Sequence, residues 1–330
     1  MIDSMNDPLG ETLRRLEGRI ERTPLREIAR EEFPSLPDGT RLFLKLECEQ
    51  VSGAFKARGA RNFIARLVAD ASPEGVITYS SGNHGRAVAE AAAAAEIPAL
   101  ITVPNTIDPS KETAIRAAGA ECVHAGATSE SRHVRAVEIA EERGWVIIPP
   151  FDHDWIIEGQ STVAAEVFEE LPEVTDLWAP VGGGGLSAGC ARAIAARAPQ
   201  VRLHAVEPIG AAAYAASVAA GERITLEKTE SVADGLLPLS IGSLNWTALR
   251  SVSAEAVTVS EAQILENLRR LRSLGVAAEP SAAVSSAPIL SAPSDAPPAP
   301  GIHVAVVSGS NVHPDRLARL LATASDGAAE

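Results

Sequence analysis

The sequence predicts an α/β protein in which parallel strands alternate with helices. Short runs of β-branched and other apolar residues are each followed by a glycine-containing turn and then by a longer, alanine-rich stretch. This alternation is typical of parallel sheets that carry helices on both faces. The chain shows no internal repeat of about 20–50 residues, which argues against a solenoid or a propeller. It also has no apolar run near the roughly 20 residues that a membrane-spanning helix needs.

The order of the expected elements follows from this rhythm. The expected strands lie at 42–47, 75–80, 98–104, 121–126, 175–181, 203–208 and 302–308. The expected helices follow the first five of them, at 57–71, 84–96, 109–119, 131–144 and 186–198. The proline-rich segment 287–301 is expected to be an exposed loop before the last strand. Ligands of such folds gather at the carboxyl ends of strands, where three unusual turns occur in this chain.

One small domain is expected to be inserted into a larger one. A proline and a glycine at 73–75, and two prolines at 149–150, bound a stretch of alternating strands and helices. We therefore predict a large domain made of residues 1–74 and 149–330, and a small inserted domain made of residues 75–148.

The charge and the cysteines restrict the function classes. The 330 residues include 29 Lys and Arg and 43 Asp and Glu, which gives a formal net charge of −14. Nucleic acids and acidic membranes bind basic surfaces, so neither is an expected partner. Cys48, Cys122 and Cys190 lack the spacing of a zinc or disulfide site and are expected to be reduced thiols. Together with the polar, acidic start of the chain, this predicts a cytoplasmic protein.

The first of the three turns is SGAFKARGA at 52–60, which carries Lys56 at a strand-to-helix junction. The positive end of a helix dipole favours the neutral, nucleophilic form of a lysine amine. A neutral amine is what a Schiff base with an aldehyde cofactor requires. The alternative is a solvated lysine on the first turn of a helix. The small neighbours Gly53, Ala54 and Ala57 favour the cofactor interpretation, because they leave room for a planar ring.

The second turn is SSGNHG at 80–85, directly after an expected strand. Its small and polar residues present successive N–H groups and hydroxyls at a helix start, which suits a carboxylate. The amide of Asn83 is expected to bind a phenolic oxygen, and the hydroxyl of Ser81 is expected to carry a proton. An ordinary helix cap is the alternative, but a cap needs one such residue rather than five.

The third turn is PVGGGGLSAG at 180–189, again between a strand and a helix. Its glycines let backbone N–H groups converge on one anion, helped by the helix dipole. The same segment supports a rival interpretation, a nicotinamide-dependent dehydrogenase. Gly183, Gly185 and Ala188 fit the dinucleotide-binding fingerprint, with Glu207 about 20 residues further on. That interpretation leaves the two earlier turns unexplained.

With the three turns taken together, the sequence resembles the fold-type II pyridoxal-phosphate enzymes, in the branch of the serine/threonine dehydratases and serine racemase. The likeness runs from RTPL (22–25) to SGSN (308–311). VADGL (232–236) and EPSAA (279–283) are similar to weaker segments of the family. The resemblance implies two parallel-sheet domains of the tryptophan synthase β kind, with the cofactor pyridoxal 5′-phosphate in the cleft between them.

The resemblance also implies roles for individual residues. Lys56 would form the Schiff base with the cofactor, Asn83 would bind the phenolic oxygen of its ring, and Ser308 would meet the ring nitrogen. The cofactor-binding residues that it implies are Phe55, Lys56, Asn83, Gly182, Gly183, Gly184, Gly185, Leu186 and Ser308. The substrate-binding residues that it implies are Ser80, Ser81, Gly82, Asn83, His84, Asp234 and Gly235.

The implied reaction is the elimination of water from L-threonine or L-serine, which yields a 2-oxo acid and ammonia. Lys56 would take the α-proton, and the β-hydroxyl would leave. A neutral hydroxyl at Ser308 makes the ring a weaker electron sink than a carboxylate would, and this favours expulsion of the β-hydroxyl. A proton from Ser81 on the opposite face of the substrate would give racemisation instead.

Other activities stay open. Within the family, the alternatives are a serine racemase and a dehydratase of another β-hydroxy amino acid, such as 3-hydroxyaspartate. Outside it, the alternatives are the dehydrogenase and a non-catalytic binding protein of the same fold. The chain ends soon after Ser308, so no additional regulatory domain is expected and a catabolic role is favoured. By resemblance we expect a homodimer that acts on a small amino acid.

The sequence departs from the family pattern at three places. Ala54 stands where the family has a serine before Phe-Lys, and Ser310 replaces the second glycine of Ser-Gly-Gly-Asn. Ala213 stands where a carboxylate ligand for a divalent cation is expected. Glu207 and the carbonyl of Ala211 alone would make a poor cation site, because hard cations want about six oxygens. No bound metal is therefore predicted.

Overall fold

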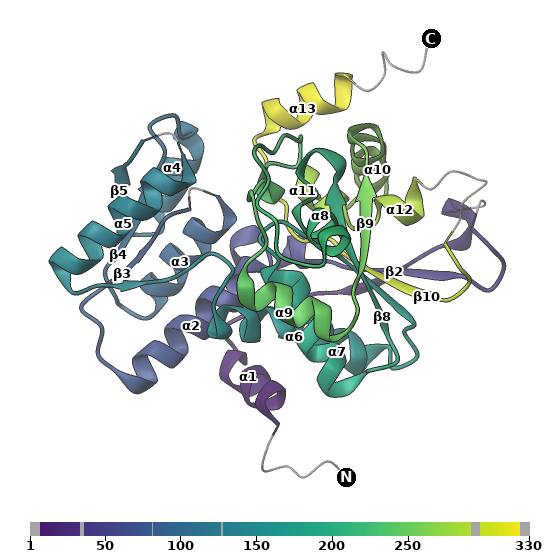
Figure 1. Ribbon diagram of the computed structural model, residues 1–330, viewed down its shortest axis with the longest axis horizontal. Coiled ribbons are helices and arrows are strands. Elements are labelled where there is room, and N and C mark those ends of the chain that lie inside the picture. Colours follow the sequence, from purple (N-terminus) through teal and green to yellow (C-terminus); the bar gives the residue numbers. More distant parts are fainter. Residues whose placement is uncertain (1–6, 34–35, 81, 127, 292–297, 324–330) are drawn as a thin grey trace.

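The α/β class is confirmed by a computed structural model, which describes residues 7–33, 36–80, 82–126, 128–291 and 298–323. Its strands form two sheets (Figure 1). The larger sheet has six strands, in the order β1 (Leu25–Ile28), β2 (Arg41–Lys45), β10 (Ile302–Val306), β7 (Asp176–Pro180), β8 (Arg202–Pro208) and β9 (Glu255–Val259). The smaller sheet has four strands, in the order β5 (Glu121–His124), β4 (Ala99–Val103), β3 (Val76–Thr78) and β6 (Val146–Ile147). All neighbouring strands are parallel except β1 and β2.

Helices connect the strands and cover the sheets (Figure 1). Those in the described ranges are α1 (Pro8–Leu16), α2 (Lys56–Asp70), α3 (Asn83–Ala94), α4 (Pro109–Ala117), α5 (Ser129–Arg143), α6 (Asp154–Glu170), α7 (Gly185–Arg197), α8 (Ala213–Ala220), α9 (Ser243–Ser251), α10 (Glu261–Ser273), α11 (Pro280–Ala283), α12 (Ala287–Leu290) and α13 (Pro314–Thr323). Short 3-10 turns include η3 (Val51–Gly53), η4 (Ile209–Ala211) and η5 (Asp234–Leu236). In the described ranges, no helix is long and apolar enough to cross a membrane.

The larger sheet is buried on both faces. Along β10, Val304 and Val306 belong to one hydrophobic cluster, whereas Ala305 and the following Val307 belong to another. Successive side chains of a strand point to opposite faces, so the two clusters lie on opposite sides of the sheet. A strand that is buried on both sides needs a continuous apolar run, which is the pattern in the sequence.

The strands expected from the sequence are confirmed, with small differences at their ends. The sequence analysis does not predict β1, β6 and β9. Each of the three lies at an edge of its sheet, and β6 has only two residues. A strand with one neighbour buries less apolar surface, and β1 and β9 accordingly include charged residues, whereas β6 is apolar but too short to stand out.

One expectation is wrong in part. The segment 287–301 begins with a helical turn, α12, rather than with an exposed loop. Ala287, Ile289 and Leu290 are buried in the same cluster as the apolar face of α10. Burial of these three side chains outweighs the loop tendency of the neighbouring prolines. Residues 292–297, at the centre of the expected loop, lie outside the described part of the chain.

The strands of the smaller sheet all come from residues 76–147 and form the body at the left of Figure 1. Their hydrophobic core also takes in Phe63 and Ile64 of α2 and Ile156 of α6. These two helices therefore pack against the small sheet as well as against the rest of the fold. The domain boundaries at 75 and 148 stay a prediction.

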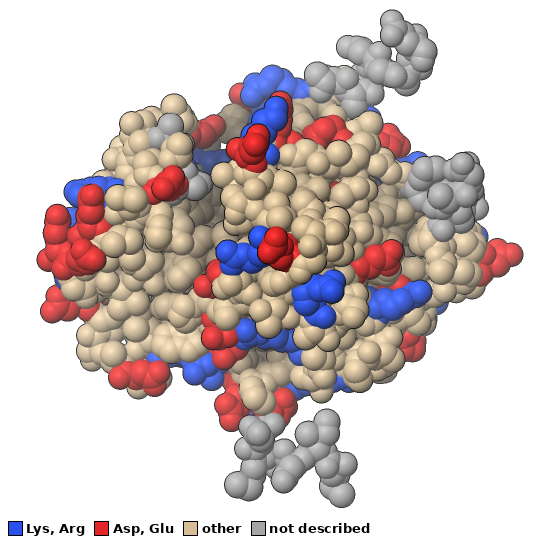
Figure 2. Space-filling view, viewed as in Figure 1, with Lys and Arg blue, Asp and Glu red and all other residues tan. Residues whose placement is uncertain are grey.

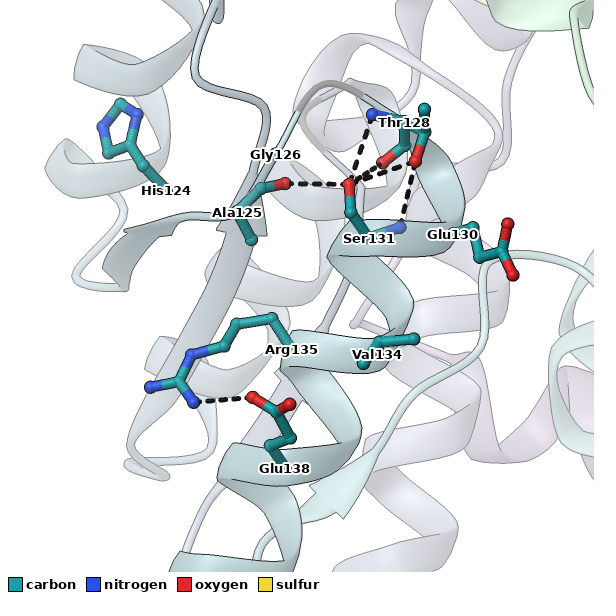
Figure 3. Close-up of a pocket in the computed structure, with 9 residues that line it drawn as sticks. All are labelled: His124, Ala125, Gly126, Thr128, Glu130, Ser131, Val134, Arg135 and Glu138. Atoms are coloured by element: carbon teal, nitrogen blue, oxygen red, sulfur yellow. Dashed lines mark hydrogen bonds and ion pairs between the residues drawn. The ribbon is translucent and has the colours of Figure 1, made fainter.

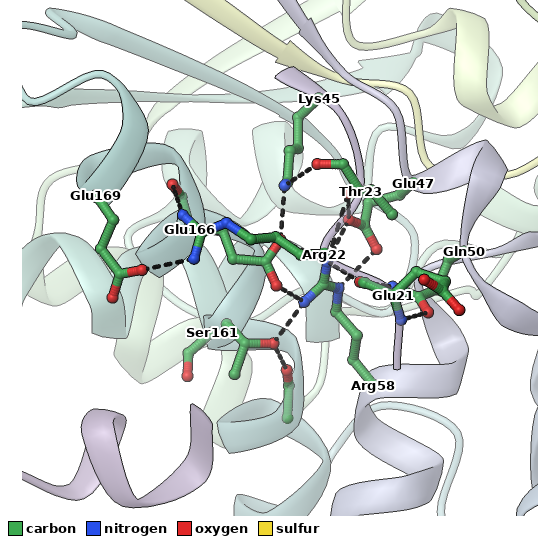
Figure 4. A network of polar contacts seen from close by, with 12 residues as sticks. Glu21, Arg22, Thr23, Lys45, Glu47, Gln50, Arg58, Ser161, Glu166 and Glu169 are labelled. Carbon is green, nitrogen blue, oxygen red and sulfur yellow. Dashed lines mark hydrogen bonds and ion pairs between the residues drawn. The ribbon is translucent and has the colours of Figure 1, made fainter. Parts of the chain in front are cut away.

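Four charged side chains are buried together at the centre of the larger part (Figure 4). Arg58 donates through Nε and Nη2 to Glu47, at 2.7 Å each, and through Nη1 to Glu166 at 2.6 Å. Nζ of Lys45 donates to Glu166 at 2.6 Å. Two cations thus balance two carboxylates, which is the condition for burying such groups. The network ties β2 to α2 and α6.

The surface carries both signs of charge. Figure 2 shows Lys and Arg mixed with Asp and Glu over the visible face, without a basic field. Cys48, Cys122 and Cys190 are all buried and free, as the absence of disulfide spacing predicts.

Candidate active site

The turn that carries Lys56 is held against the end of β10. Gly53 takes a φ of 72°, and a side chain there would lie 2.7 Å from Oδ1 of Asn311. The N–H of Phe55 donates to the carbonyl of Ser308 at 3.0 Å. The structure thus brings Lys56 and Ser308 to neighbouring turns, as the resemblance implies.

The amine of Lys56 is enclosed at the first turn of α2. Nζ donates to the carbonyl of Pro150 at 2.7 Å and lies 5.1 Å from the centre of the Phe55 ring. Burial lowers the pKa of Lys56 to about 8. Desolvation, rather than the helix dipole expected from the sequence, is the cause of the neutral amine in the structure. The result is the same, because a lysine with this pKa is partly neutral near physiological pH.

The four glycines at 182–185 connect β7 to α7 at the carboxyl end of a central strand. Gly184 caps α7 with a φ of 91°. The carbonyl of Gly183 accepts from Nδ2 of Asn245 at 2.7 Å and from the N–H of Gly242 at 3.0 Å. The first N–H groups of α7 have no partner inside the helix, so the loop presents them to an anion. Leu186, in the same first turn, is buried.

Phe151 joins this glycine loop to the lysine. A side chain at Gly183 would overlap the ring of Phe151, and one at Gly185 would lie 3.0 Å from its Cβ. The residue before Phe151 is Pro150, whose carbonyl accepts from Lys56. The glycine loop and the amine are therefore anchored to one segment.

Replacing Gly184 with alanine is expected to destabilise the protein by about 2–4 kcal/mol. A Cβ there would lie 2.9 Å from Cγ1 of Ile241 and from Cβ of Asn245, in addition to the strain of a positive φ. Gly221→Ala is the matched control, because Gly221 has a φ of 76° but nothing within 4 Å. Urea unfolding of both variants, with a titration of the expected cofactor, measures the difference. Equal losses would contradict the tight packing of the glycine loop.

The turn between β3 and α3 holds the residues expected to bind a carboxylate. Gly82 is the N-cap of α3, and Asn83 is its first residue. A side chain at Gly85 would overlap the carbonyl of Ser80, so glycine lets the helix close onto the strand end. Ser81, the expected proton carrier, lies outside the described residues.

His84 is buried close to the amine. Its Nε2 lies 3.3 Å from the carbonyl of Ile148. Burial and the charge of Lys56 lower the pKa of His84 to about 3, so the ring is neutral at physiological pH. A carbonyl only accepts, hence Nε2 carries the proton and Nδ1 is an acceptor. Within the described part of the chain, no partner is found for this buried Nδ1.

Asp234 and Gly235 lie in η5, beside the glycine loop. A Cβ at Gly182 would lie 3.2 Å from the carbonyl oxygen of Gly235. The carboxylate of Asp234 pairs with Arg316 at 2.5 Å and with Lys111 at 3.4 Å. The two residues are thus near the candidate site, and their role in substrate binding stays a prediction.

The two unusual residues near the lysine turn have different surroundings. Ala54 is fully buried and forms a bridge with Gly309, so the small side chain fits a close approach of two backbones. The hydroxyl of Ser310 donates to the carbonyl of Cys48 at 2.9 Å and lies 3.3 Å from that of Gly53. Ser310 thereby adds a side-chain link to the turn that carries the lysine.

Glu207 is the second-to-last residue of β8, and its carboxylate caps α8. Its two carboxylate oxygens accept the N–H groups of Tyr214 and Ala215, at 2.8 and 2.9 Å. Burial raises the pKa of Glu207 to about 7, although these donors oppose the rise. A buried carboxylate committed to the backbone does not provide the ribose contact of the dinucleotide fingerprint. Ala211, its weak partner in the cation hypothesis, is buried in η4.

Glu207→Ala is expected to destabilise the protein by about 1–3 kcal/mol, because two backbone donors at the start of α8 lose their acceptor. We also expect magnesium to leave the melting temperature of the unaltered protein unchanged, since a bound ion would raise it. Thermal unfolding with and without magnesium measures both effects. A magnesium-dependent rise that Glu207→Ala removes would contradict the capping role.

A shallow depression elsewhere on the surface does not carry comparable chemistry (Figure 3). It lies beside α5, and Arg135 pairs there with Glu138 at 2.8 Å. Thr128 and Ser131 form a capping box at the start of the helix. Its polar groups therefore serve the helix itself.

The sequence analysis does not single out Pro150, Phe151, Asn245 or Glu279 as site residues. The first three contact the lysine or the glycine loop, and Glu279 contacts Asn83. From the sequence, the two prolines at 149–150 are predicted only to mark a domain boundary. The signal for Glu279 is its position at the head of EPSAA, a segment otherwise made of small and apolar residues.

The described residues fit pyridoxal phosphate. A buried lysine of lowered pKa suits a bond to an aldehyde, and the glycine loop at a helix N-terminus suits a phosphate. The amide of Asn83 and the hydroxyl of Ser308 lie on turns that meet beside the lysine. Glycine is required at 183–185 because side chains there would collide with neighbouring residues.

The chain belongs to a family of cofactor-dependent enzymes. Residues 16–309 match the model of the family described as pyridoxal-phosphate dependent enzyme. Enzymes of this family use pyridoxal phosphate. The two largely parallel sheets agree with the fold-type II class within it.

The relatives narrow the branch to serine racemases and threonine deaminases. A serine racemase from Arabidopsis thaliana is 39% identical over 278 residues, which cover 84% of this chain and 83% of that protein. The structure of maize serine racemase is similar with a TM-score of 0.87 and 34% identity, covering 98% of both chains. The structure of a T.th. threonine deaminase has a TM-score of 0.85 and 36% identity, covering 93% of this chain and 98% of that one. The family supports elimination or racemisation and does not distinguish the two here.

Proposed function

We propose that the chain is an ammonia-lyase that removes water from L-threonine or L-serine and yields a 2-oxo acid and ammonia. The observation that carries the proposal is the enclosed amine of Lys56, whose pKa of about 8 leaves part of it neutral beside the start of α3. A base of this kind is suited to an α-proton. We also propose a catabolic role, a homodimer and a cytoplasmic location, in line with the sequence analysis.

Different groups of the chain would bind the cofactor, bind the substrate and transfer the proton. Bound pyridoxal phosphate supplies an aldehyde for amino groups and a ring that withdraws electrons from the α-carbon. The first N–H groups of α7 hold the phosphate, and those of α3 hold the substrate carboxylate. The neutral amine of Lys56 takes the α-proton and holds it at Nζ. The uncharged hydroxyl of Ser308 would face the ring nitrogen without keeping it protonated, which would favour loss of the β-hydroxyl.

A second candidate is racemisation of serine. Its support is the 39% identity to a protein named serine racemase. Racemisation needs a proton donor on the face of the substrate opposite Lys56, and Ser81 is the proposed donor. A dehydratase of 3-hydroxyaspartate is a third candidate within the same chemistry.

The test is a comparison of products from L-threonine, L-serine and 3-hydroxyaspartate. With L-threonine or L-serine as substrate, we expect 2-oxo acid and ammonia to form faster than the D-enantiomer of that substrate forms. D-serine without 2-oxo acid would favour the racemase, and bound cofactor without either product would favour a non-catalytic protein. Ser81→Ala should suppress racemisation selectively, so equal loss of both activities would contradict its role.

A further inference from the structure

A chain of side chains fixes the amide of Asn83. Its Nδ2 donates to Oε1 of Glu279 at 2.8 Å, and its Oδ1 accepts from Nδ2 of Asn311 at 2.8 Å. Nδ2 of Asn311 also donates to the carbonyl of Ser52 at 2.7 Å, and its Oδ1 accepts from Nη1 of Arg86 at 3.1 Å. Arg86, Asn311, Asn83 and Glu279 thus form one continuous hydrogen-bonded chain, which we call the amide relay.

The groups at the two ends of the amide relay determine which way each of its two amides is oriented. A guanidinium only donates and a backbone carbonyl only accepts, so Arg86 and Ser52 together fix which end of Asn311 is the oxygen. The nitrogen of Asn311 then requires the oxygen of Asn83 to face it. An ionised carboxylate only accepts, so Glu279 independently requires the nitrogen of Asn83 to face it. Both ends therefore select the same orientation of the Asn83 amide.

Glu279 lies deep in the site, next to the turn that follows β10. Its side chain is buried, and its N–H donates to the carbonyl of Gly309 at 3.0 Å. A Cβ at Gly309 would lie 2.7 Å from Oε1 of Glu279 and 3.2 Å from Nδ2 of Asn83. The carboxyl, the Asn83 amide and the turn that carries Ser308 are therefore in mutual contact.

We propose that Glu279 is a positioning residue, which acts through the amide relay to present the remaining N–H of Asn83 as a donor to the phenolic oxygen of bound pyridoxal phosphate. An amide nitrogen carries two hydrogens, and Glu279 occupies one of them. Reversal of the amide would replace this donor with an oxygen and set two acceptors against each other. The inference rests on the proposed function only in that the site binds the cofactor.

The carboxyl adds a pH signature. Burial raises the pKa of Glu279 to about 7, and the charge of Asp234 adds to the rise. The N–H of Asn83 and the charges of Lys111 and Arg316 act in the opposite direction. Protonation removes the charge of the carboxylate and adds an O–H donor, so the carboxyl becomes a weaker acceptor for the N–H of Asn83. Cofactor affinity should therefore fall as the pH falls through about 7, below the range in which Lys56 titrates. Glu279→Gln should remove this component and leave the one near 8 that belongs to Lys56.

The amide relay is tested by Asn311→Asp, because an aspartate accepts from Arg86 but does not donate to Ser52 or Asn83. We expect pyridoxal phosphate to bind about tenfold more weakly or worse, with a changed visible spectrum of the bound cofactor. Asn62→Asp is the matched control. Asn62 is more deeply buried than Asn311, accepts from Arg15 at 2.8 Å and donates to the carbonyl of Trp155 at 2.6 Å, outside the site.

The control should lose stability in urea yet keep the affinity and spectrum of the unaltered protein. The proposal is overturned if folded Asn311→Asp and Glu279→Gln both keep the affinity, spectrum and pH dependence of that protein, or if Asn62→Asp changes them as much. If Asn311→Asp does not fold, the pH dependence in Glu279→Gln decides alone. Failure of the unaltered chain to bind the cofactor would instead refute the proposed function.

Discussion

Replacing Lys56 with alanine should abolish turnover, with a loss of at least about 1,000-fold, because one amine supplies both the bond to the cofactor and the base. The variant should also lack the visible absorbance that borohydride removes from the unaltered protein. Product assays and absorption spectra before and after borohydride measure the two effects. Substantial residual activity would refute the mechanism.

Lys228→Ala is the control for this variant, since Lys228 is exposed and is not among the candidate site residues. It should keep both activity and absorbance. The pH gives a further signature. Because the pKa of Lys56 is lowered to about 8, attachment of cofactor to the cofactor-free protein should accelerate as the pH rises through 8. An ordinary lysine, with a pKa near 10.5, would show that acceleration at higher pH.

Arg58→Met should destabilise the protein by about 3–5 kcal/mol at neutral pH, because it leaves two buried carboxylates with one cation. Glu47 would lose both of its guanidinium contacts, and Glu166 would keep Lys45. The free energy of unfolding in urea measures the loss. A loss below about 1 kcal/mol, the range of exposed pairs, would contradict the energetic importance of the network.

Arg66→Met is the matched control. Arg66 lies on the same helix and pairs with Glu158 of α6 at 2.6 Å, but this pair is partly exposed. Its loss should cost less than about 1 kcal/mol. The Arg58–Glu166 and Arg66–Glu158 pairs both join an arginine of α2 to a glutamate of α6, so the two variants differ mainly in the burial of the pair.

The pH dependence of Arg58→Met has a definite sign. Burial opposes ionisation of Glu47, but the charge and hydrogen bonds of Arg58 outweigh it and hold the pKa of Glu47 below its ordinary 4.5. A depressed pKa contributes stability above 4.5 that is lost as the pH falls. Without Arg58, burial raises this pKa and reverses the contribution. The difference between the variant and the unaltered protein should therefore shrink as the pH is lowered towards 4.5.

The central part of the fold could be predicted because burial on both faces leaves a direct record in the sequence. β7 and β10 are mostly apolar runs of five residues. The edge strands β1 and β9 interrupt their apolar residues with charged or polar ones, and β6 has only two residues. α6 escaped prediction for a related reason. Its buried surface includes Gln160, Thr162 and Glu166, so core positions look like surface positions. Thr162 and Glu166 pair with Arg58 of α2, and Glu166 also pairs with Lys45 of β2. Local sequence does not reveal such pairing.

The candidate site could be predicted where a turn has an unusual composition. The lysine turn, the carboxylate turn and the glycine loop stand out for this reason, and the structure brings them together. Phe151 and Asn311 do not stand out, since a phenylalanine after two prolines or an asparagine in a turn is common. Their importance comes from contacts with residues distant in sequence, such as Gly183 and Arg86.

The three buried cysteines bear on what reacts with an incoming aldehyde. Burial raises the pKa of Cys48 and of Cys190 to about 12, and it also raises that of Cys122. A thiol reacts through its thiolate, so burial lowers the reactivity of each of the three at physiological pH. The aldehyde of pyridoxal phosphate should therefore react with the nitrogen of Lys56 rather than with a cysteine sulfur. Treatment of the folded, cofactor-free protein with thiol-alkylating reagents should not reduce its later binding of the cofactor.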